Sequence, residues 1–122
     1  MILGFTSAFV PQIIDGTKVH TIRSGSRWQV GQVIEFCTGS LPAATRRFRP
    51  DAQVLAIQTV QLTLVQQTIC LELDGRPLRG QELLTFARRD GFDSPNLLGE
   101  FFAGHYGLPF TGQLLHWTDL RY

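Results

Sequence analysis

The chain has 122 residues, a formal net charge of +1, and a composition that is 43% hydrophobic and 17% charged. These values exclude a disordered chain, and they exclude the broad positive field of a protein that coats nucleic acid without specificity. The length predicts one domain, residues 1–122, large enough to bury a core without metal or disulfide support.

Several kinds of site and location are not expected. No apolar run approaches the roughly 20 residues that a membrane-spanning helix needs, and residues 1–5 lack the basic leader of a signal peptide, so we expect a cytoplasmic protein with no membrane partner. Cys37 and Cys70 lie far apart within apolar runs, which favours buried, reduced thiols. No two histidines have metal-ligand spacing, so neither a metal nor a cofactor is expected.

The first half of the chain predicts short elements. We expect a strand over residues 1–5, then a short helix capped by Ser7 and ended by Gly16. Two strands follow, over 19–23 and 33–37, the second introduced by a turn at 30–32. Residues 38–50 have no periodic apolar pattern and predict an irregular segment.

The second half shows clearer periodicity. Alternation over residues 52–73 predicts strands with a reversal at Gln66-Gln67, and the stretch 74–77 is typical of a turn. Helical spacing predicts helices over 81–89 and from Ser94-Pro95 to about 106, followed by a strand over 110–118. About six strands and three short helices without regular β-α-β alternation predict an α+β fold built on a small mixed β-barrel.

Polar chemistry is concentrated in one stretch, residues 15–27. Side chains alternate along a regular strand, which would separate Lys18 from Thr21. If the turn at 15–17 extends to Lys18, its long side chain can reach the face that carries Thr21 and Arg23. We prefer this second arrangement.

Four blocks of sequence, in this order along the chain, resemble ASCH domains. They are Gly-Thr-Lys-Val-His-Thr-Ile-Arg at 16–23, Val-Gly-Gln-Val-Ile at 30–34, Phe-Ala-Arg-Arg-Asp-Gly-Phe-Asp-Ser at 86–94, and Gly-Gln-Leu-Leu-His-Trp at 112–117. The resemblance implies a PUA-like β-barrel with a cleft beside it for RNA or a modified nucleoside.

Some small bacterial ASCH proteins are amidohydrolases that remove the acetyl group from N4-acetylcytidine with a threonine, a lysine and a carboxylate. Their Lys-x-x-Thr-Ile-Arg motif falls on Lys18, Thr21, Ile22 and Arg23, and their glutamate falls on Asp90, which is one methylene shorter. The resemblance therefore implies Thr21 as nucleophile, Lys18 as base and Asp90 as acid or base.

Elementary chemistry is compatible with this set. A threonine hydroxyl is a poor nucleophile until a base accepts its proton, and lysine serves as a base only when its pKa is lowered towards neutrality. Burial beside a second cation, Arg23, would lower that pKa. The structural alternative is that Lys18 is a solvated turn residue, Thr21 an ordinary strand residue and Asp90 a turn residue.

Other residues suggest RNA contacts. Arg46, Arg47 and Arg49 surround Phe48 in the only local basic cluster, Thr45 to Arg49, and such clusters grip phosphate while the aromatic ring stacks on a base. His20 could contact a base or phosphate, and Trp28 could stack at the cleft mouth, although core packing is equally compatible with Trp28 and Phe48. These residues leave two alternatives to amide hydrolysis: a non-catalytic RNA-binding module, or a ribonuclease in which His20 or Lys18 supplies an acid or base.

Overall fold

A computed structural model describes residues 1–39 and 46–122. In chain order its elements are β1 (Ile2–Phe5), the 3-10 helix η1 (Ser7–Phe9), α1 (Val10–Ile14), β2 (His20–Ser24), β3 (Val33–Thr38), β4 (Arg46–Arg47), β5 (Ala52–Gln53), β6 (Ala56–Val65), β7 (Thr68–Leu73), β8 (Arg76–Leu78), α2 (Gly80–Arg89), α3 (Pro95–His105) and β9 (Phe110–His116).

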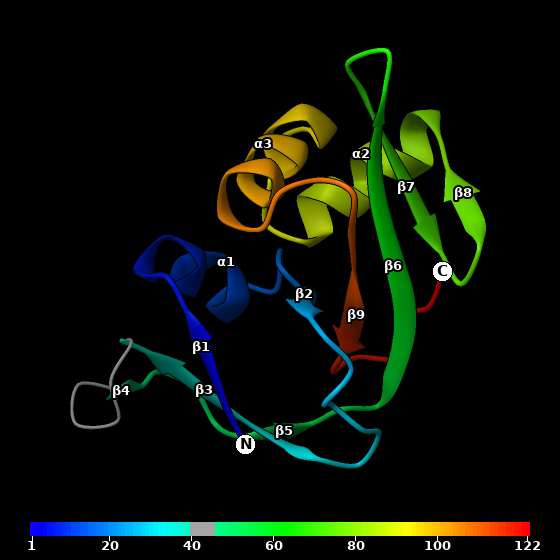
Figure 1. Cartoon of the computed structure of the whole chain (residues 1–122). Coiled ribbons are helices and arrows are strands. Elements are labelled where there is room, and N and C mark those ends of the chain that lie inside the picture. The colour runs from blue at the N-terminus through cyan, green and yellow to red at the C-terminus, as the bar shows by residue number, and fades with distance from the viewer. Residues whose placement is uncertain (40–45) are drawn as a thin grey trace.

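The strands form two sheets. One has the order β1-β3-β4, with β5 also paired to β3, and its β1–β3 pair is parallel. The other has the order β2-β9-β6-β7-β8 and is antiparallel throughout. The expected α+β class is confirmed. In the part of the chain that the structure describes, however, the two sheets do not join into one closed barrel (Figure 1).

The strand count differs from the expected six because the structure adds short strands. β4 and β5 have two residues each and β8 has three. Such short strands carry no readable alternation, and their pairing depends on neighbours that are distant in sequence. The expected irregular segment at 38–50 thus includes a strand at Arg46–Arg47, and residues 40–45 lie outside the described residues.

Local sequence explains most turns and helix ends. Gln66 and Gln67 both have positive φ, 50° and 63°, as a two-residue hairpin turn requires, and they join β6 to β7 where a reversal was expected. Ser94 caps α3, because its hydroxyl accepts a 3.2 Å hydrogen bond from the Leu97 amide, and Pro95 opens the helix. The expected cap at Ser7 is wrong, since Ser7 lies inside η1 and the preceding Thr6 makes no side-chain cap bond.

Three layers result from the alternation of side chains along the second sheet. Leu114 and Leu115 are adjacent on β9, and both are fully buried. Leu114 packs in a cluster with α2 and α3, whereas Leu115 packs in a second cluster with β1, β3 and α1. Helices α2 and α3 therefore cover one face of the second sheet, and the first sheet together with α1 covers the other (Figure 1).

Both cysteines were expected to be buried, reduced thiols, and no membrane-spanning helix was expected. Cys37 is buried and Cys70 is half-buried, and both are free thiols. Among the helices of residues 1–39 and 46–122, none has the length and hydropathy needed to cross a membrane.

Candidate functional site

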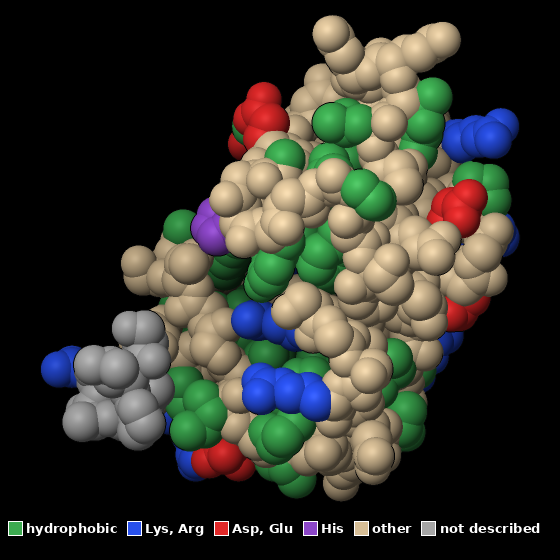
Figure 2. Space-filling model, viewed as in Figure 1, with side chains coloured by type: hydrophobic (Ala, Val, Ile, Leu, Met, Phe, Trp, Pro, Cys, Tyr) green, Lys and Arg blue, Asp and Glu red, His purple; other side chains and the backbone are tan. Residues whose placement is uncertain are grey.

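A cavity lies where the two sheets approach each other. In the described residues, β1 is at one edge of the first sheet and β2 is at one edge of the second. The cavity between them has a volume of about 80 Å³, and the end of α2 and one side of α3 complete its wall. Figure 2 shows this face of the molecule, where Lys or Arg side chains and hydrophobic side chains meet in a hollow below the helices.

Four residues expected to form a site line this cavity together: Lys18, Thr21, Arg23 and Asp90. Strand β2 begins only at His20, so Lys18 precedes the strand and does not follow its alternation. Two main-chain hydrogen bonds fix this segment, from the Lys18 amide to the Gln12 carbonyl at 3.0 Å and from the Val19 amide to the Arg89 carbonyl at 2.9 Å. The turn thus brings the lysine side chain to the end of α2.

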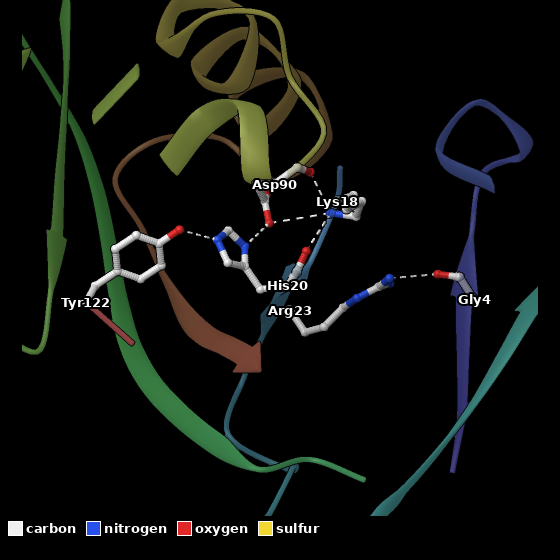
Figure 3. A network of polar contacts seen from close by, with 6 residues as sticks. All are labelled: Gly4, Lys18, His20, Arg23, Asp90 and Tyr122. Atoms are coloured by element: carbon white, nitrogen blue, oxygen red, sulfur yellow. Dashed lines mark hydrogen bonds and ion pairs between the residues drawn. The ribbon is translucent and has the colours of Figure 1, made fainter. Parts of the chain in front are cut away.

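Lys18 is only 2% exposed, and its amine is fully engaged. Nζ donates to the main-chain carbonyls of His20, at 2.8 Å, and Asp90, at 2.5 Å, and lies 3.4 Å from Oδ1 of Asp90 (Figure 3). Burial lowers the pKa of Lys18, Asp90 opposes this effect and the positive charge of Arg23 adds to it, and the net result is a pKa of about 8. A measurable fraction of the amine is therefore neutral near pH 7 to 8.

Asp90 ends α2 and is 2% exposed. A carboxylate at this end of a helix opposes the helix dipole by roughly 0.3–1 kcal/mol, and the adjacent ammonium of Lys18 offsets that effect. The next residue, Gly91, has a φ of 101°, and this left-handed conformation ends the helix. The contacts of Oδ1 with Lys18 and His20 hold the carboxylate at the cavity wall.

The hydroxyl of Thr21 has a different environment. Thr21 is 5% exposed and lines the cavity, and in residues 1–39 and 46–122 no group is hydrogen-bonded to its hydroxyl. Its main chain is fixed by pairing of β2 with Leu115 of β9. The cavity therefore holds a positioned hydroxyl that is free to react or to bind.

Arg23 crosses the cavity from β2 to β1. Its Nη2 donates a 2.8 Å hydrogen bond to the Gly4 carbonyl (Figure 3). Its guanidinium lies 4.9 Å from the centre of the Phe5 ring. Nε is buried and has no partner in the described part of the chain. Arg23 therefore supplies a fixed positive charge and an unused donor at the cavity wall.

An aromatic wall faces these polar groups, and the sequence did not indicate it. Phe9, Phe92 and Phe101 pack edge to face or tilted, with ring centres 5.3–6.1 Å apart, and they line the cavity with Tyr106. Phe101 lies in α3 and Tyr106 directly follows it, and helical spacing would place such residues on an apolar helix face, where core residues also lie. The only available signal was the content of nine phenylalanines.

Two expected ligand contacts need correction. His20 is fully buried and does not line the cavity, because its Nδ1 lies 2.9 Å from Asp90 Oδ1 and its Nε2 lies 2.6 Å from the Tyr122 hydroxyl. Trp28 is 2% exposed and packs in the core cluster between the two sheets. Neither side chain can stack on or bind a ligand without leaving the interior.

The arginine cluster lies on β4 and just beyond it, and its described members do not line the cavity. Arg47 pairs with Glu35 at 2.8 Å and with Asp51 at 3.5 Å, and Arg49 lies 4.3 Å from the centre of the Phe36 ring. Phe48 packs against the core between the sheets. Arg46 is exposed, and Thr45 lies outside the described residues.

Within the described ranges, no three His, Cys, Asp or Glu side chains gather closely enough to hold a metal ion. No family model, curated protein or solved structure matches the chain.

Proposed function

We propose that this chain is an ASCH domain with a PUA-like fold, and that its cavity binds the base of a modified nucleoside, free or within RNA, and hydrolyses an N4-acyl amide. One observation carries the proposal. The buried Lys18 amine, whose pKa is lowered to about 8, shares a cavity with the Thr21 hydroxyl and the Asp90 carboxylate. Titratable groups with perturbed pKa values in a cavity are typical of active sites.

The chemistry begins with the neutral amine of Lys18. A neutral amine keeps two N–H donors, enough for the two carbonyls at 2.5 and 2.8 Å, and gains a lone pair for the hydroxyl proton of Thr21. The Thr21 oxygen then attacks the amide carbon, giving a tetrahedral intermediate whose negative oxygen is stabilised by Arg23.

Collapse of that intermediate breaks the C–N bond. The leaving amine takes the proton held by Lys18, with Asp90, 3.4 Å from Nζ, as the group that relays it. Water then hydrolyses the acyl ester on Thr21, with Lys18 again accepting a proton. The products are the free 4-amino base and a carboxylic acid, so atoms and charge balance.

Cavity size and lining are compatible with such a substrate. A volume of about 80 Å³ is below the 300–1,000 Å³ typical of pockets that enclose a whole drug-sized ligand. The acyl amide and the adjoining edge of the base would enter a cavity of this size, and the rest of the nucleoside would remain outside. The phenylalanine rings that line the cavity, among them Phe9 and Phe92, give it the apolar wall that a planar heterocycle requires.

The test is hydrolysis of N4-acetylcytidine, followed by chromatography of the cytidine released. Thr21→Ala should abolish turnover while substrate still binds, and Thr21→Ser should retain activity because it keeps a hydroxyl. Lys18→Ala should also lose turnover. Thr111→Ala, which removes an exposed hydroxyl from β9, is the matched control. Turnover that survives in Thr21→Ala would refute the nucleophile and, with it, this mechanism.

A second candidate is a non-catalytic RNA-binding module. The exposed side chains of Arg46 and Arg47 favour it, because phosphate contacts need accessible cations. RNA cleavage is the third alternative, and Lys18 would have to supply its acid or base, since both ring nitrogens of His20 are engaged.

A further inference from the structure

A series of polar contacts, buried at Lys18, Asp90 and His20 and partly buried at Tyr122, leads from the cavity to the segment after β9. It runs from Lys18 Nζ to Asp90 Oδ1 at 3.4 Å, from that oxygen to His20 Nδ1 at 2.9 Å, and from His20 Nε2 to the Tyr122 hydroxyl at 2.6 Å (Figure 3). Tyr122 is 102 residues from His20 in sequence. Neither His20 nor Tyr122 lines the cavity, yet both lie behind its carboxylate.

The positions of the hydrogen atoms in this series of contacts follow from the groups on either side of His20, which are Asp90 and Tyr122. An ionised Asp90 can only accept, so His20 Nδ1 must carry a hydrogen and donate it. Burial lowers the pKa of His20 and raises the pKa of Tyr122 to about 12. The imidazole is therefore neutral, its Nε2 is an acceptor, and the tyrosine hydroxyl donates to it. Only the His20 tautomer with hydrogen on Nδ1 satisfies Asp90, His20 and Tyr122 together.

Tyr122 is held firmly enough to impose this order. Gln58 of β6 donates from Nε2 to the Tyr122 carbonyl at 2.9 Å and accepts from the Tyr122 amide at 3.3 Å. The same Gln58 oxygen lies 2.9 Å from His116 Nε2. Around His20, the Phe86 ring stacks at 4.9 Å, and the charged or titratable neighbours are Lys18, Arg89, Asp90, His116 and Tyr122.

We propose that His20 and Tyr122 are positioning residues of the site, in which the Tyr122 hydroxyl fixes the His20 tautomer and His20 holds Oδ1 of Asp90 beside Lys18. This role rests on the proposed function. Because Oδ1 of Asp90 is held in this way, the second carboxylate oxygen, Oδ2, is available to a ligand in the cavity. In the described residues Oδ2 has no hydrogen-bond partner. An aspartate held in this way can act where the related enzymes use a longer glutamate.

The first arm of the test does not depend on activity. Spectra of the protein labelled with ¹⁵N-histidine report which ring nitrogen of His20 carries hydrogen. We expect Nδ1–H in the unmodified protein. In Tyr122→Phe the Nε2 resonance should shift and the pKa of His20 should rise, because a hydrogen bond to the neutral form is removed. Nε2–H in the unmodified protein, or an unaltered spectrum in Tyr122→Phe, would overturn the proposal.

The second arm measures hydrolysis of N4-acetylcytidine. Tyr122→Phe should lower kcat by about 10-fold or more, as the loss of orienting partners does at other sites, with little change in KM. His20→Asn keeps a donor where Nδ1 stood and should retain more activity than His20→Ala. Thr111→Val is the control for loss of a hydroxyl. Equal kcat in His20→Asn and His20→Ala would overturn the positioning role. Absence of turnover in every form, including the unmodified protein, would count against the proposed function, and the spectra would still decide the His20 tautomer.

Discussion

The main-chain carbonyl of His20 accepts a 2.8 Å hydrogen bond from Nζ of Lys18, which precedes it by two residues. The lysine side chain thus extends forward along the outer edge of β2, on the side away from β9. This edge has no partner strand in the described residues, so its carbonyl is available to a side chain. The reactive amine is therefore positioned by the same edge that forms the cavity.

The rate of hydrolysis should depend on the charge of Lys18. Because the base is the neutral amine and its pKa is about 8, kcat should rise with pH and level off above an apparent pKa of about 8. Arg23→Gln removes a positive neighbour that lowers the pKa, so its profile should move to higher pH. A pH profile of kcat for both forms measures this.

Arg27→Gln is the matched control for that experiment. Arg27 is exposed and does not line the cavity, so its loss should leave the apparent pKa unchanged. A profile that is flat from pH 7 to 9 in the unmodified protein would show that Lys18 does not act as the base.

Stability should also increase with pH above 8. The folded-state pKa of Lys18, about 8, lies below its ordinary value of 10.5, so between these values the unfolded chain binds more protons than the folded protein. The free energy of unfolding then rises with pH, by on the order of 3 kcal/mol in total. Tyr122, with a pKa raised to about 12, has the opposite effect, but only above about pH 10.

Urea denaturation at pH 8, 9 and 10 isolates this contribution, with Lys18→Met as the comparison. The methionine variant has no ammonium to neutralise, so the rise should disappear from it. An equal rise in the free energy of unfolding of both forms would show that groups other than Lys18 cause the pH dependence.

The sequence predicted those features that depend on near neighbours. The cap at Ser94, the reversal at Gln66-Gln67 and the helix over Gly80–Arg89 each follow from residues within one or two turns of chain. The same holds for the turn that brings Lys18 towards Thr21 and Arg23, because a short polar segment ahead of a strand determines it.

Features that depend on distant contacts could not be predicted in this way. His20 was expected at a ligand because it lies in a polar segment, but its partners Asp90 and Tyr122 are 70 and 102 residues away. Trp28 follows the same polar segment, yet it packs between two sheets whose arrangement no local pattern specifies. Burial of a polar side chain becomes visible only when its partners are known.

Gly91 should be intolerant of any side chain. Its φ is 101°, and a Cβ there would lie 2.6 Å from Gln12 Oε1 and 2.8 Å from Phe9 Cδ1. Gly91→Ala should lose about 2 kcal/mol or more of unfolding free energy through backbone strain and displacement of Phe9. Turnover should fall as well, since Phe9 and Asp90 line the cavity.

Gly104 of α3 is the matched control for this substitution. A Cβ at Gly104 would meet nothing within 4 Å, and alanine favours a helix over glycine by about 0.5–1 kcal/mol. Urea denaturation should therefore move the two midpoints in opposite directions. A Gly91→Ala variant as stable as the unmodified protein would show that Phe9 is not held as described.

Neutralising the arginine cluster decides between nucleoside hydrolysis and RNA binding. The variant carrying Arg46→Gln, Arg47→Gln and Arg49→Gln changes no residue of the cavity, so hydrolysis of free N4-acetylcytidine should be unaffected. If the cluster grips phosphate, affinity for RNA should fall, and the slope of its logarithm against the logarithm of salt concentration should decrease by about 0.7 per lost contact. Because Arg47 already pairs with Glu35 and Asp51 and Arg49 lies over Phe36, we expect a decrease closer to one contact than three. An unchanged slope would remove the cluster from any RNA interface and leave the cavity as the proposed ligand site.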